Sequence, residues 1–593
     1  MEIIEKLLRL WRGPVEEPAG RKRRSVKPSE ITYGIDDKPP AYVVWVAAIQ
    51  HVLLASVTTI FPLLVLEAAH ASHQTVLEVM SGSLLALGFG TILLCLKSQD
   101  LGSSSLMPAA FSGVYFTVTV VAAKQGGLPL VAGMTIFAGL VQLLIGYGVQ
   151  RLRPFLPTEI AGFAMLMSGL TLGVIGFNLM TGVSAAIDTM NPSMGTGALL
   201  GVACLLVMIA LYVWGVARLR LYVILIVLAG GYAAGAALGL VPFNEVKSAS
   251  LFIEPPMPKP SWPTFAVDLM LPFASAAIAT SLRAIGDFTS MQKINDSRWQ
   301  RADMGSIRRG LISNGIGMMI GGALGSVGLS TSSSSVGLSV TTGVTSRSVG
   351  FATGVVFIVL AFLPAVHELI ILAPRPVFGA ALVFTSCFII VNGMQAMVSR
   401  LMDARRTLVI SVGLLLSFSR FLFPAFYQSA PDYLQPAVAS PLVVGLIGAL
   451  LLNLVFRIGI KKSVTIVVAP GADALTKLEK FAEHQGGVWG ARRDVIDRAV
   501  RAMIETSECL DLLIEPGTSA KVTMTFDEFW LDVLVEYEGK PLITSAAAPS
   551  AEELFADESQ LTRLGAIMIR RQATKLTTDT DGAMQRIHLG FEH

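Results

Sequence analysis

An arginine and an aspartate, Arg283 and Asp287, lie one helical turn apart in the stretch SLRAIGDFTSMQ, residues 281–292. This stretch ends an apolar run that begins near Phe265, and the next water-side charge is Lys293. At ~1.5 Å of rise per residue, Arg283 lies roughly 15 Å inside that lysine, near the middle of a hydrocarbon layer. A guanidinium at that depth is costly unless it lines a cavity or meets a counter-charge, so Arg283 is a candidate functional residue.

Two interpretations of this pair are open. At i, i+4 the two side chains share a helix face, and an internal ion pair would only neutralise two buried charges. Alternatively, Arg283 faces a pocket, where its planar donors suit a carboxylate or another delocalised anion. Arginine stays charged at physiological pH and cannot act as a coupling acid. Asp287 is then the remaining candidate for proton coupling.

The composition excludes an ordinary soluble protein. Hydrophobic residues make up 53% of the 593 residues and charged residues only 15%, against about 25% in soluble domains. The net charge of +3 is too small to predict a nucleic-acid partner. The four cysteines are scattered without disulfide or metal-type spacing. No nucleophile–base group or phosphate loop occurs, so we expect neither an enzyme nor a protein that needs a cofactor or metal.

The apolar runs predict a polytopic α-helical membrane protein of about fourteen spans. The expected spans are 41–66, 76–97, 104–123, 128–149, 157–178, 196–216, 219–240, 264–288, 307–328, 331–345, 348–366, 376–396, 406–424 and 438–457. Lysine and arginine gather after the even-numbered spans, whereas the loops EAAHASHQT, GVSAAIDTMNPSMG and YQSAPDYLQP after odd-numbered spans have none. By the positive-inside rule, both termini are cytoplasmic in a cell inner (plasma) membrane. Residues 1–40 lack a signal peptide and form a cytoplasmic tail.

Two of the expected spans are unusual. The third has Pro108 and Gly113 near its start, and the tenth is rich in serine. Short, interrupted segments in both halves of a transporter indicate a binding site near the bilayer midplane. Within the tenth span, Ser332 to Ser335 are expected to cap a half-helix whose free N–H groups favour an anionic or carbonyl-bearing ligand. The alternative is that both spans are ordinary packing helices with small residues and back-bonded serines.

The composition changes abruptly after Lys462. Residues 463–593 have ordinary charge density, alternating stretches such as SVTIVVAP, and helical ones such as RRDVIDRAVRAMIETSECLDLL. This pattern predicts a compact, soluble cytoplasmic α/β domain of about 130 residues.

Four stretches in the first part of the chain carry a family resemblance. They are YGIDDKPPAYVVWVAAIQHVLLASVTTIFPLLV, SLRAIGDF, IRRGLISNGIGMMIGGALG and STSSSSVGLSVTTGVTSR. In this order they resemble the nucleobase–ascorbate transporter family, also called nucleobase:cation symporter family 2, which includes xanthine and uracil permeases. The resemblance implies a transporter domain over residues 41–457 with two inverted seven-span repeats. A core (spans 1–4 and 8–11) would move against a gate (spans 5–7 and 12–14) in an elevator mechanism.

The resemblance also implies site residues. Substrate would bind between short half-strands in spans 3 and 10, beside the half-helix at Ser334, Ser335 and Gly337. Tyr115 aligns with a substrate-stacking aromatic, although tyrosines are also interface anchors. The pair Gln50 and His51 would organise the site by hydrogen bonds, although a lone buried histidine is more often a packing residue.

Three positions depart from the family pattern. Arg283 stands where the family usually has a glutamate that holds the nucleobase and takes part in proton coupling. Asn314 replaces a common aspartate, and it could still bond to substrate or to span 8. Ser334 and Ser335 replace a glutamate or glutamine followed by asparagine. The sign of the charge at the centre of the site has therefore reversed.

The C-terminal domain weakly resembles the histidine-kinase-type ATPase fold, through the helix around Val500 to Leu512 and the stretch FDEFWLDVLVEYEG. Its helix reads IETSECL, with Glu505 and Glu508 but without the asparagine that would coordinate magnesium and phosphate. No D-x-G-x-G loop follows. We expect a degenerate domain with a regulatory or dimerising role.

Three functions remain open from the sequence. The first is a permease for a nucleobase such as xanthine, urate or uracil, or a related planar solute, with H⁺ or Na⁺ as possible coupling ions. The second is uncoupled or exchange transport of an organic or inorganic anion at a basic site. The third is a substrate sensor that signals through the C-terminal domain. The family resemblance implies a homodimer in the lipid bilayer.

Overall fold

A computed structural model describes residues 26–592, apart from 153–156, 183–193, 217–221, 242–261, 298, 300–301, 373, 399–401, 403, 432–433, 457–461, 470, 490, 492, 516, 528–529, 543–558 and 582–583. The chain divides into two compact units, one of residues 24–454 and one that contains residues 455–593. The two units are described separately below.

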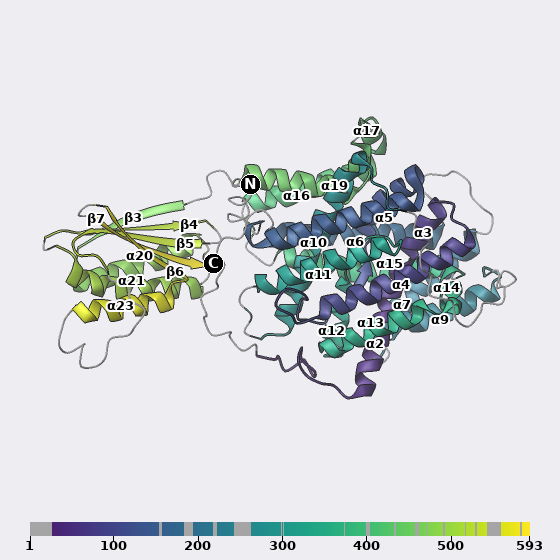
Figure 1. Cartoon of the computed structure of the whole chain (residues 1–593), viewed down its shortest axis with the longest axis horizontal. Helices are drawn as coiled ribbons and strands as arrows, with labels where there is room; N and C mark the ends of the chain where they lie inside the picture. The colour runs from purple at the N-terminus through teal and green to yellow at the C-terminus, as the bar shows by residue number, and fades with distance from the viewer. Residues whose placement is uncertain are drawn as a thin grey trace. The chain divides into compact units, whose positions relative to one another are not determined.

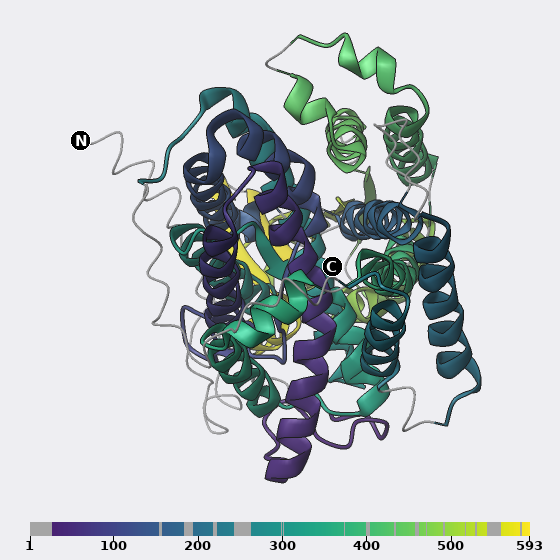
Figure 2. The ribbon, with the colours of Figure 1, turned by 90° about the vertical axis from the view of Figure 1, so that its right-hand side faces the viewer.

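Apolar helices make up most of the first unit. Most of them run side by side in Figure 1, and Figure 2 views the same bundle from its end. Its elements are α2 (Ala41–Ser56), η1 (Val57–Thr59), α3 (Ile60–Ala68), α4 (His73–Cys95), β1 (Ala109–Phe111), α5 (Gly113–Leu152), α6 (Thr158–Thr181), α7 (Met194–Trp214), α9 (Val223–Ala237), α10 (Val267–Ile294), α11 (Met304–Ala323), β2 (Leu329–Thr331), α12 (Ser333–Thr342), α13 (Arg347–Ala361), α14 (Pro364–Ile371), α15 (Arg375–Met397), α16 (Ala404–Leu422), α17 (Pro424–Gln428), α18 (Gln435–Val438) and α19 (Pro441–Val455).

The unit is a multi-pass membrane protein. Within the described residues, seven helices are long and apolar enough to cross a membrane. The pair α13 and α14, bent by 88°, adds an eighth if it is counted as one span. Every range expected as a span contains helix, but several of these helices are short or broken, so the count of fourteen remains a prediction.

The only two strands described in this unit are β1, inside the third expected span, and β2, which ends at the first residue of the tenth. Pro108 precedes β1, and the serine run follows β2. The two strands pair antiparallel, with Ala109 opposite Thr331 and Phe111 opposite Leu329. The short half-strands implied by the family resemblance are therefore present, and span 10 is not an ordinary packing helix.

The break between spans 3 and 4 lies where the sequence predicts it. The helix α5 includes the end of span 3 and all of span 4, and it is interrupted at Gly127, where φ is +66° and ψ is −159°. A positive φ is costly for residues with a Cβ, so glycine marks the break between the two helical pieces.

Two similar close contacts join helices of the first half of this unit to helices of the second. Helix α4 (span 2) packs on α13 (span 11), and α11 (span 9) packs on α5 (span 4). A Cβ on Gly354 would lie 2.9 Å from the carbonyl oxygen of Gly88, and a Cβ on Gly315 would lie 2.8 Å from that of Gly139. If each of the first seven expected spans is exchanged with the span seven places later, the contact between spans 2 and 11 becomes the contact between spans 9 and 4. The packing therefore indicates two structurally related halves.

The second unit is a five-stranded sheet with helices against it. The strands are β3 (Lys462–Val468), β4 (Ala520–Phe526), β5 (Trp530–Glu538), β6 (Lys575–Asp581) and β7 (Met584–Glu592), in the antiparallel order β3-β4-β5-β7-β6. The helices are α20 (Ala472–Trp489), α21 (Arg493–Leu513) and α23 (Ser559–Gln572). They lie on one side of the sheet (Figure 1), and a shared apolar core joins the two layers. The resemblance to histidine-kinase-type ATPases remains a prediction.

Candidate functional site

Five helices meet at the strand pair, and four of them (α2, α10, α11 and α12) carry expected site residues. Helices α2 and α4 pack on β1, whereas α10 and α11 pack on β2. Helix α12 follows β2 directly and packs on both α2 and α10. The strand pair is continued at its ends, because Ser112 N donates to the Gly328 carbonyl at 3.1 Å and Ser332 N donates to the Pro108 carbonyl at 3.0 Å. The sheet therefore fixes where α5 and α12 begin.

The N-terminus of α12 is capped by serines, as the sequence predicts. Ser332 is the N-cap residue, and its hydroxyl oxygen accepts from the backbone N–H of Ser335 at 3.4 Å. The hydroxyl of Ser335 donates to the same oxygen at 2.8 Å, and the Ser334 hydroxyl lies 3.2 Å from it. One turn later, the Ser339 hydroxyl back-bonds to the Ser335 carbonyl. Both roles expected for the serines therefore occur: they cap α12, and they back-bond within it. The cap lies at the candidate site.

Gly337 leaves open space on α12. A Cβ on this residue would meet no heavy atom within 4 Å, although the residue is only half-exposed. Ser334 is also half-buried, whereas Ser335 is buried. The side of the half-helix that carries Ser334 and Gly337 can therefore accept a neighbour that the protein itself does not provide.

Arg283 and Asp287 are buried on α10, 6% and 1% exposed, and they meet on a third residue. Arg283 Nη2 donates to the backbone carbonyl of Thr331 at 3.0 Å. The Thr331 hydroxyl donates to Asp287 Oδ2 at 2.5 Å. These two described side chains form no direct ion pair within 4.0 Å of each other, so the internal ion pair that the spacing allowed is not formed. Arg283 Nε and Asp287 Oδ1 are buried without a hydrogen-bond partner.

Tyr115 is 1% exposed, so it is not an interface anchor. Its hydroxyl lies 2.8 Å from the Thr280 hydroxyl on α10, and its ring stacks on Phe273 at 6.5 Å between centroids. The residue therefore joins the first turn of α5 to α10. Its contact with a substrate remains a prediction.

The remaining expected site residues are buried on two other helices. Gln50 and His51 lie on α2, and Asn314 lies on α11. His51 Nδ1 and Asn314 Nδ2 have no hydrogen-bond partner. The implied network around Gln50 and His51 is therefore not formed through His51 Nδ1, and the roles of these three residues remain predictions.

Sequence reasoning missed Thr331 and Thr280. A threonine next to a serine run carries no distinctive signal, and the backbone carbonyl of Thr331 has none at all. Thr280 lies one turn before Arg283 on α10, and that spacing could have suggested it as a partner for a polar side chain from another span. Among the described residues, no cluster of three or more His, Cys, Asp or Glu side chains could hold a metal ion.

The chain is similar in sequence to known permeases. Residues 44–425 match the sequence model of a permease family. The chain is 26% identical over 442 residues to the xanthine permease XanP of Escherichia coli (strain K12), covering 72% of this chain and 95% of that protein. It is 25% identical over 435 residues to the uric acid permease PucJ of Bacillus subtilis (strain 168), covering 72% and 96%. The transmembrane domain of a cyanobacterium bicarbonate transporter, BicA, superposes with a TM-score of 0.44 at 16% identity, covering 68% and 96%.

Proposed function

This chain belongs to the nucleobase–ascorbate transporter family, whose permease model its residues 44–425 match, and we propose that it carries an oxopurine such as xanthine or urate across the membrane. An oxopurine is planar, its edges alternate carbonyl oxygens with N–H groups, and urate is an anion at neutral pH. The relatives named for xanthine and uric acid support this substrate class.

One observation carries the proposal. Arg283 is buried where the family pattern has a glutamate, and its Nη2 is bound to the Thr331 carbonyl while its Nε has no partner. Buried polar groups in native proteins are nearly always hydrogen-bonded, so a free guanidinium N–H inside the membrane part calls for a ligand. A delocalised anion or a carbonyl edge fits a planar donor.

The half-helix α12 supplies the second group of donors. Ser332 caps the N–H of Ser335, whereas the N–H groups of Ser333 and Ser334 have no partner within the helix, and the partial positive charge at this N-terminus favours an anion or a carbonyl oxygen. The open space beside Gly337 and the half-buried Ser334 lie on the same short helix. In this arrangement a purine edge accepts hydrogen bonds from α12 and Arg283, and the Tyr115 ring lies at the start of α5.

The proposed transport cycle uses the same residues. Arg283 cannot exchange a proton at physiological pH, so coupling to H⁺ falls to Asp287, whose Oδ1 has no partner. A core of spans 1–4 and 8–11 moves against a gate of spans 5–7 and 12–14. Both termini are cytoplasmic, the protein is a homodimer in the inner membrane, and the C-terminal unit regulates or dimerises it.

Transport by purified protein in liposomes tests the proposal. We expect uptake of urate or xanthine, with urate preferred over neutral uracil. Arg283→Gln should weaken urate binding about 10- to 100-fold, the equivalent of one charged hydrogen bond, and uracil much less. Arg283→Lys keeps the charge but loses the planar fork, so it should restore only part of the affinity.

Arg375→Gln is a matched control, since Arg375 is a half-exposed arginine in an ion pair with Glu67. It should bind urate as the parent does. Equal urate binding by the parent and by Arg283→Gln would contradict the proposal. Transport of bicarbonate or sulfate with no purine binding would favour the anion-exchange alternative instead.

A further inference from the structure

The segment of residues 26–37, which precedes the first helix, is bonded into the membrane unit. It runs beside the connection between α12 and α13, with Tyr33 bridged in parallel to Val344. Tyr33 N donates to the Gly343 carbonyl at 3.0 Å, and Thr345 N donates to the Tyr33 carbonyl at 2.8 Å. Arg347 N donates to the Ile35 carbonyl at 3.1 Å. We call residues 26–37 the clasp.

Asp36 of the clasp binds two cations from different helices. Lys97, just after α4, lies 2.6 Å from Oδ2, and Arg347, the first residue of α13, lies 2.7 Å from Oδ1. Each carboxylate oxygen therefore holds a different helix end. The hydrogen bond from Lys97 lowers the pKa of Asp36 below its ordinary value of 3.8; burial opposes this effect, and the hydrogen bond from Arg347 adds to it. The carboxylate is charged at neutral pH.

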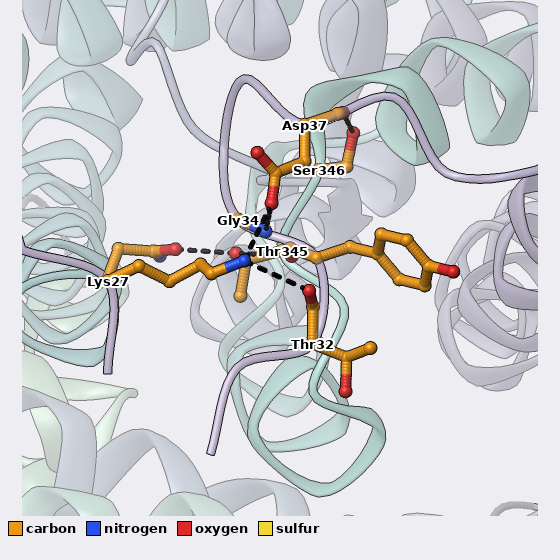
Figure 3. A network of polar contacts seen from close by, with 8 residues as sticks. Lys27, Thr32, Gly34, Asp37, Thr345 and Ser346 are labelled. Carbon is orange, nitrogen blue, oxygen red and sulfur yellow. Dashed lines mark hydrogen bonds and ion pairs between the residues drawn. The ribbon is translucent and has the colours of Figure 1, made fainter. Parts of the chain in front are cut away.

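Asp37 closes the clasp on itself and on α13 (Figure 3). Its Oδ2 accepts from Gly34 N at 2.8 Å and from Lys27 Nζ at 3.0 Å. Lys27 also donates to the Thr32 carbonyl at 3.2 Å. The Ser346 hydroxyl donates to the backbone carbonyl of Asp37 at 2.6 Å. The loop of the clasp is thus fixed before it reaches α2.

The clasp also reaches the end of α10. Val26 N donates to Asp296 Oδ1 at 3.0 Å, and Ser297 N donates to the Val26 carbonyl at 2.9 Å. Next to it, the Thr345 hydroxyl donates to Asn295 Oδ1 at 2.5 Å. The ends of α10 and α12, the helices that carry Arg283 and Ser334, are therefore joined at one place.

We infer that the clasp makes the ends of α4, α10, α12 and α13 move as one body, and that Asp36 is a positioning residue for transport. In the described part of the chain, none of the hydrogen bonds of residues 26–37 goes to α6, α7, α9, α15, α16 or α19. The bonded helices belong to the proposed core and the others to the proposed gate. The inference rests on the proposed function for its transport consequences.

The first test compares three variants of the full chain in liposomes. Asp36→Asn keeps the shape but loses the charge that both cations bind, so the maximal uptake rate should fall about tenfold while substrate affinity stays within about twofold. Asp36→Glu should recover most of the rate. Asp100→Asn, at an exposed aspartate in the loop after α4, should match the parent. A parent-like rate in Asp36→Asn, or a loss of affinity as large as the loss of rate, would overturn the inference.

The second test fixes the clasp covalently. Tyr33→Cys and Val344→Cys place two thiols on bridged residues, on a background where the exposed Cys387 is replaced by serine. Because the clasp moves with α12 and α13, the oxidised protein should transport at the rate of the reduced protein. If oxidation stops transport, the clasp opens during the cycle and the inference is wrong.

A third readout needs no substrate. Backbone hydrogen exchange over residues 338–347 should be faster in Asp36→Asn than in the parent and in Asp100→Asn, because the bonds of the clasp to Gly343 and Thr345 loosen. Unchanged exchange would overturn the inference even if the transported solute is not a purine. Conversely, if exchange is faster in Asp36→Asn but the parent protein transports no purine, the inference about the clasp stands and the proposed function is rejected.

Discussion

Arg283 and Thr331 are joined by a hydrogen bond of 3.0 Å from the guanidinium Nη2 to the backbone carbonyl. Thr331 is the last residue of β2, so this bond ties α10 to the strand pair just before α12 begins. The Thr331 hydroxyl also donates to Asp287, so Thr331 is hydrogen-bonded to both of these oppositely charged side chains. The arginine is oriented by the backbone and keeps its Nε for another partner.

Removal of the Thr331 hydroxyl should destabilise the protein. Thr331→Val keeps the shape and the carbonyl but leaves Asp287 Oδ2 without its donor, at a cost of about 1–3 kcal/mol. We expect a lower melting temperature for the detergent-solubilised protein, and recovery in Thr331→Ser. Thr341→Val is the control, since Thr341 is exposed and bonds only to the Leu338 carbonyl. Equal melting of Thr331→Val and Thr341→Val would count against this role.

Two glycines should respond differently to the same small change. In Gly315→Ala the new Cβ would lie 2.8 Å from both the Gly139 oxygen and the Leu143 nitrogen, so α5 and α11 must separate. We expect a loss of about 1–3 kcal/mol and poor yield of folded protein. Gly337→Ala meets no atom within 4 Å and should fold normally, but it occupies the open space and should weaken substrate binding. Size-exclusion profiles and binding measurements separate the two effects.

The two ion pairs at the ends of α15 and α6 should differ in energy. Arg375 and Glu67 lie 2.6 Å apart with side chains 59% and 41% exposed, so a double-mutant cycle should give about 0.2–1 kcal/mol, less at high salt. Arg406 and Glu159 lie 3.1 Å apart with side chains 16% and 3% exposed. Glu159→Gln removes a buried partner and should cost about 3–5 kcal/mol. A salt-independent coupling at Glu67 would refute the first expectation.

In the C-terminal unit, burial, together with the charges of Glu505 and Glu508, raises the pKa of the Cys509 thiol from 9.0 to about 12. The folded thiol therefore stays protonated at pH 8. Iodoacetamide should label Cys509 only after unfolding, as mass spectrometry of the full chain can measure. Rapid labelling of the native protein at pH 8 would disprove this protection.

The same shift has a consequence for stability. Because the pKa of Cys509 is higher in the folded than in the unfolded protein, its contribution to the free energy of unfolding is complete below about pH 9. That contribution is lost as the pH rises toward 12. Burial likewise raises the pKa of Tyr537 from 10.0 to about 12, with the same sign. Cys509→Ala should reduce the alkaline loss of stability of this unit but not abolish it, and denaturant unfolding at pH 8 and pH 11 measures the difference.

The membrane class and the special spans could be predicted because composition and single residues determine them. Apolar runs located the helices, and Pro108, Gly113 and the serine run indicated that spans 3 and 10 are interrupted, whereas the strands themselves were implied by the family resemblance. The link between Arg283 and Asp287 through Thr331 could not be predicted, because i, i+4 spacing fixes only a shared helix face. The group that accepts the hydrogen bond of Arg283 is a backbone carbonyl, which every residue carries.

The N-terminal segment shows a second limit. Residues 1–40 were expected to form a tail, because a short polar stretch resembles any exposed terminus. In the structure, residues 26–37 are bonded to helices whose sequence positions are distant, such as Arg347 and Asp296. Nothing local to the segment identifies those partners. The sequence of this segment also contains a basic run, Arg21, Lys22, Arg23 and Arg24, which lies outside the described residues.

The paired packing of the two halves affects how the protein is made. Ser81 on α4 donates to the Ala361 carbonyl, 280 residues later, and Gly88 meets Gly354. During synthesis the first half therefore enters the bilayer long before its packing partners exist. Its small-residue surfaces and unpaired polar groups stay uncovered until α11 and α13 have been inserted. A chain that terminates before α11 and α13 therefore leaves α4 and α5 without these packing partners.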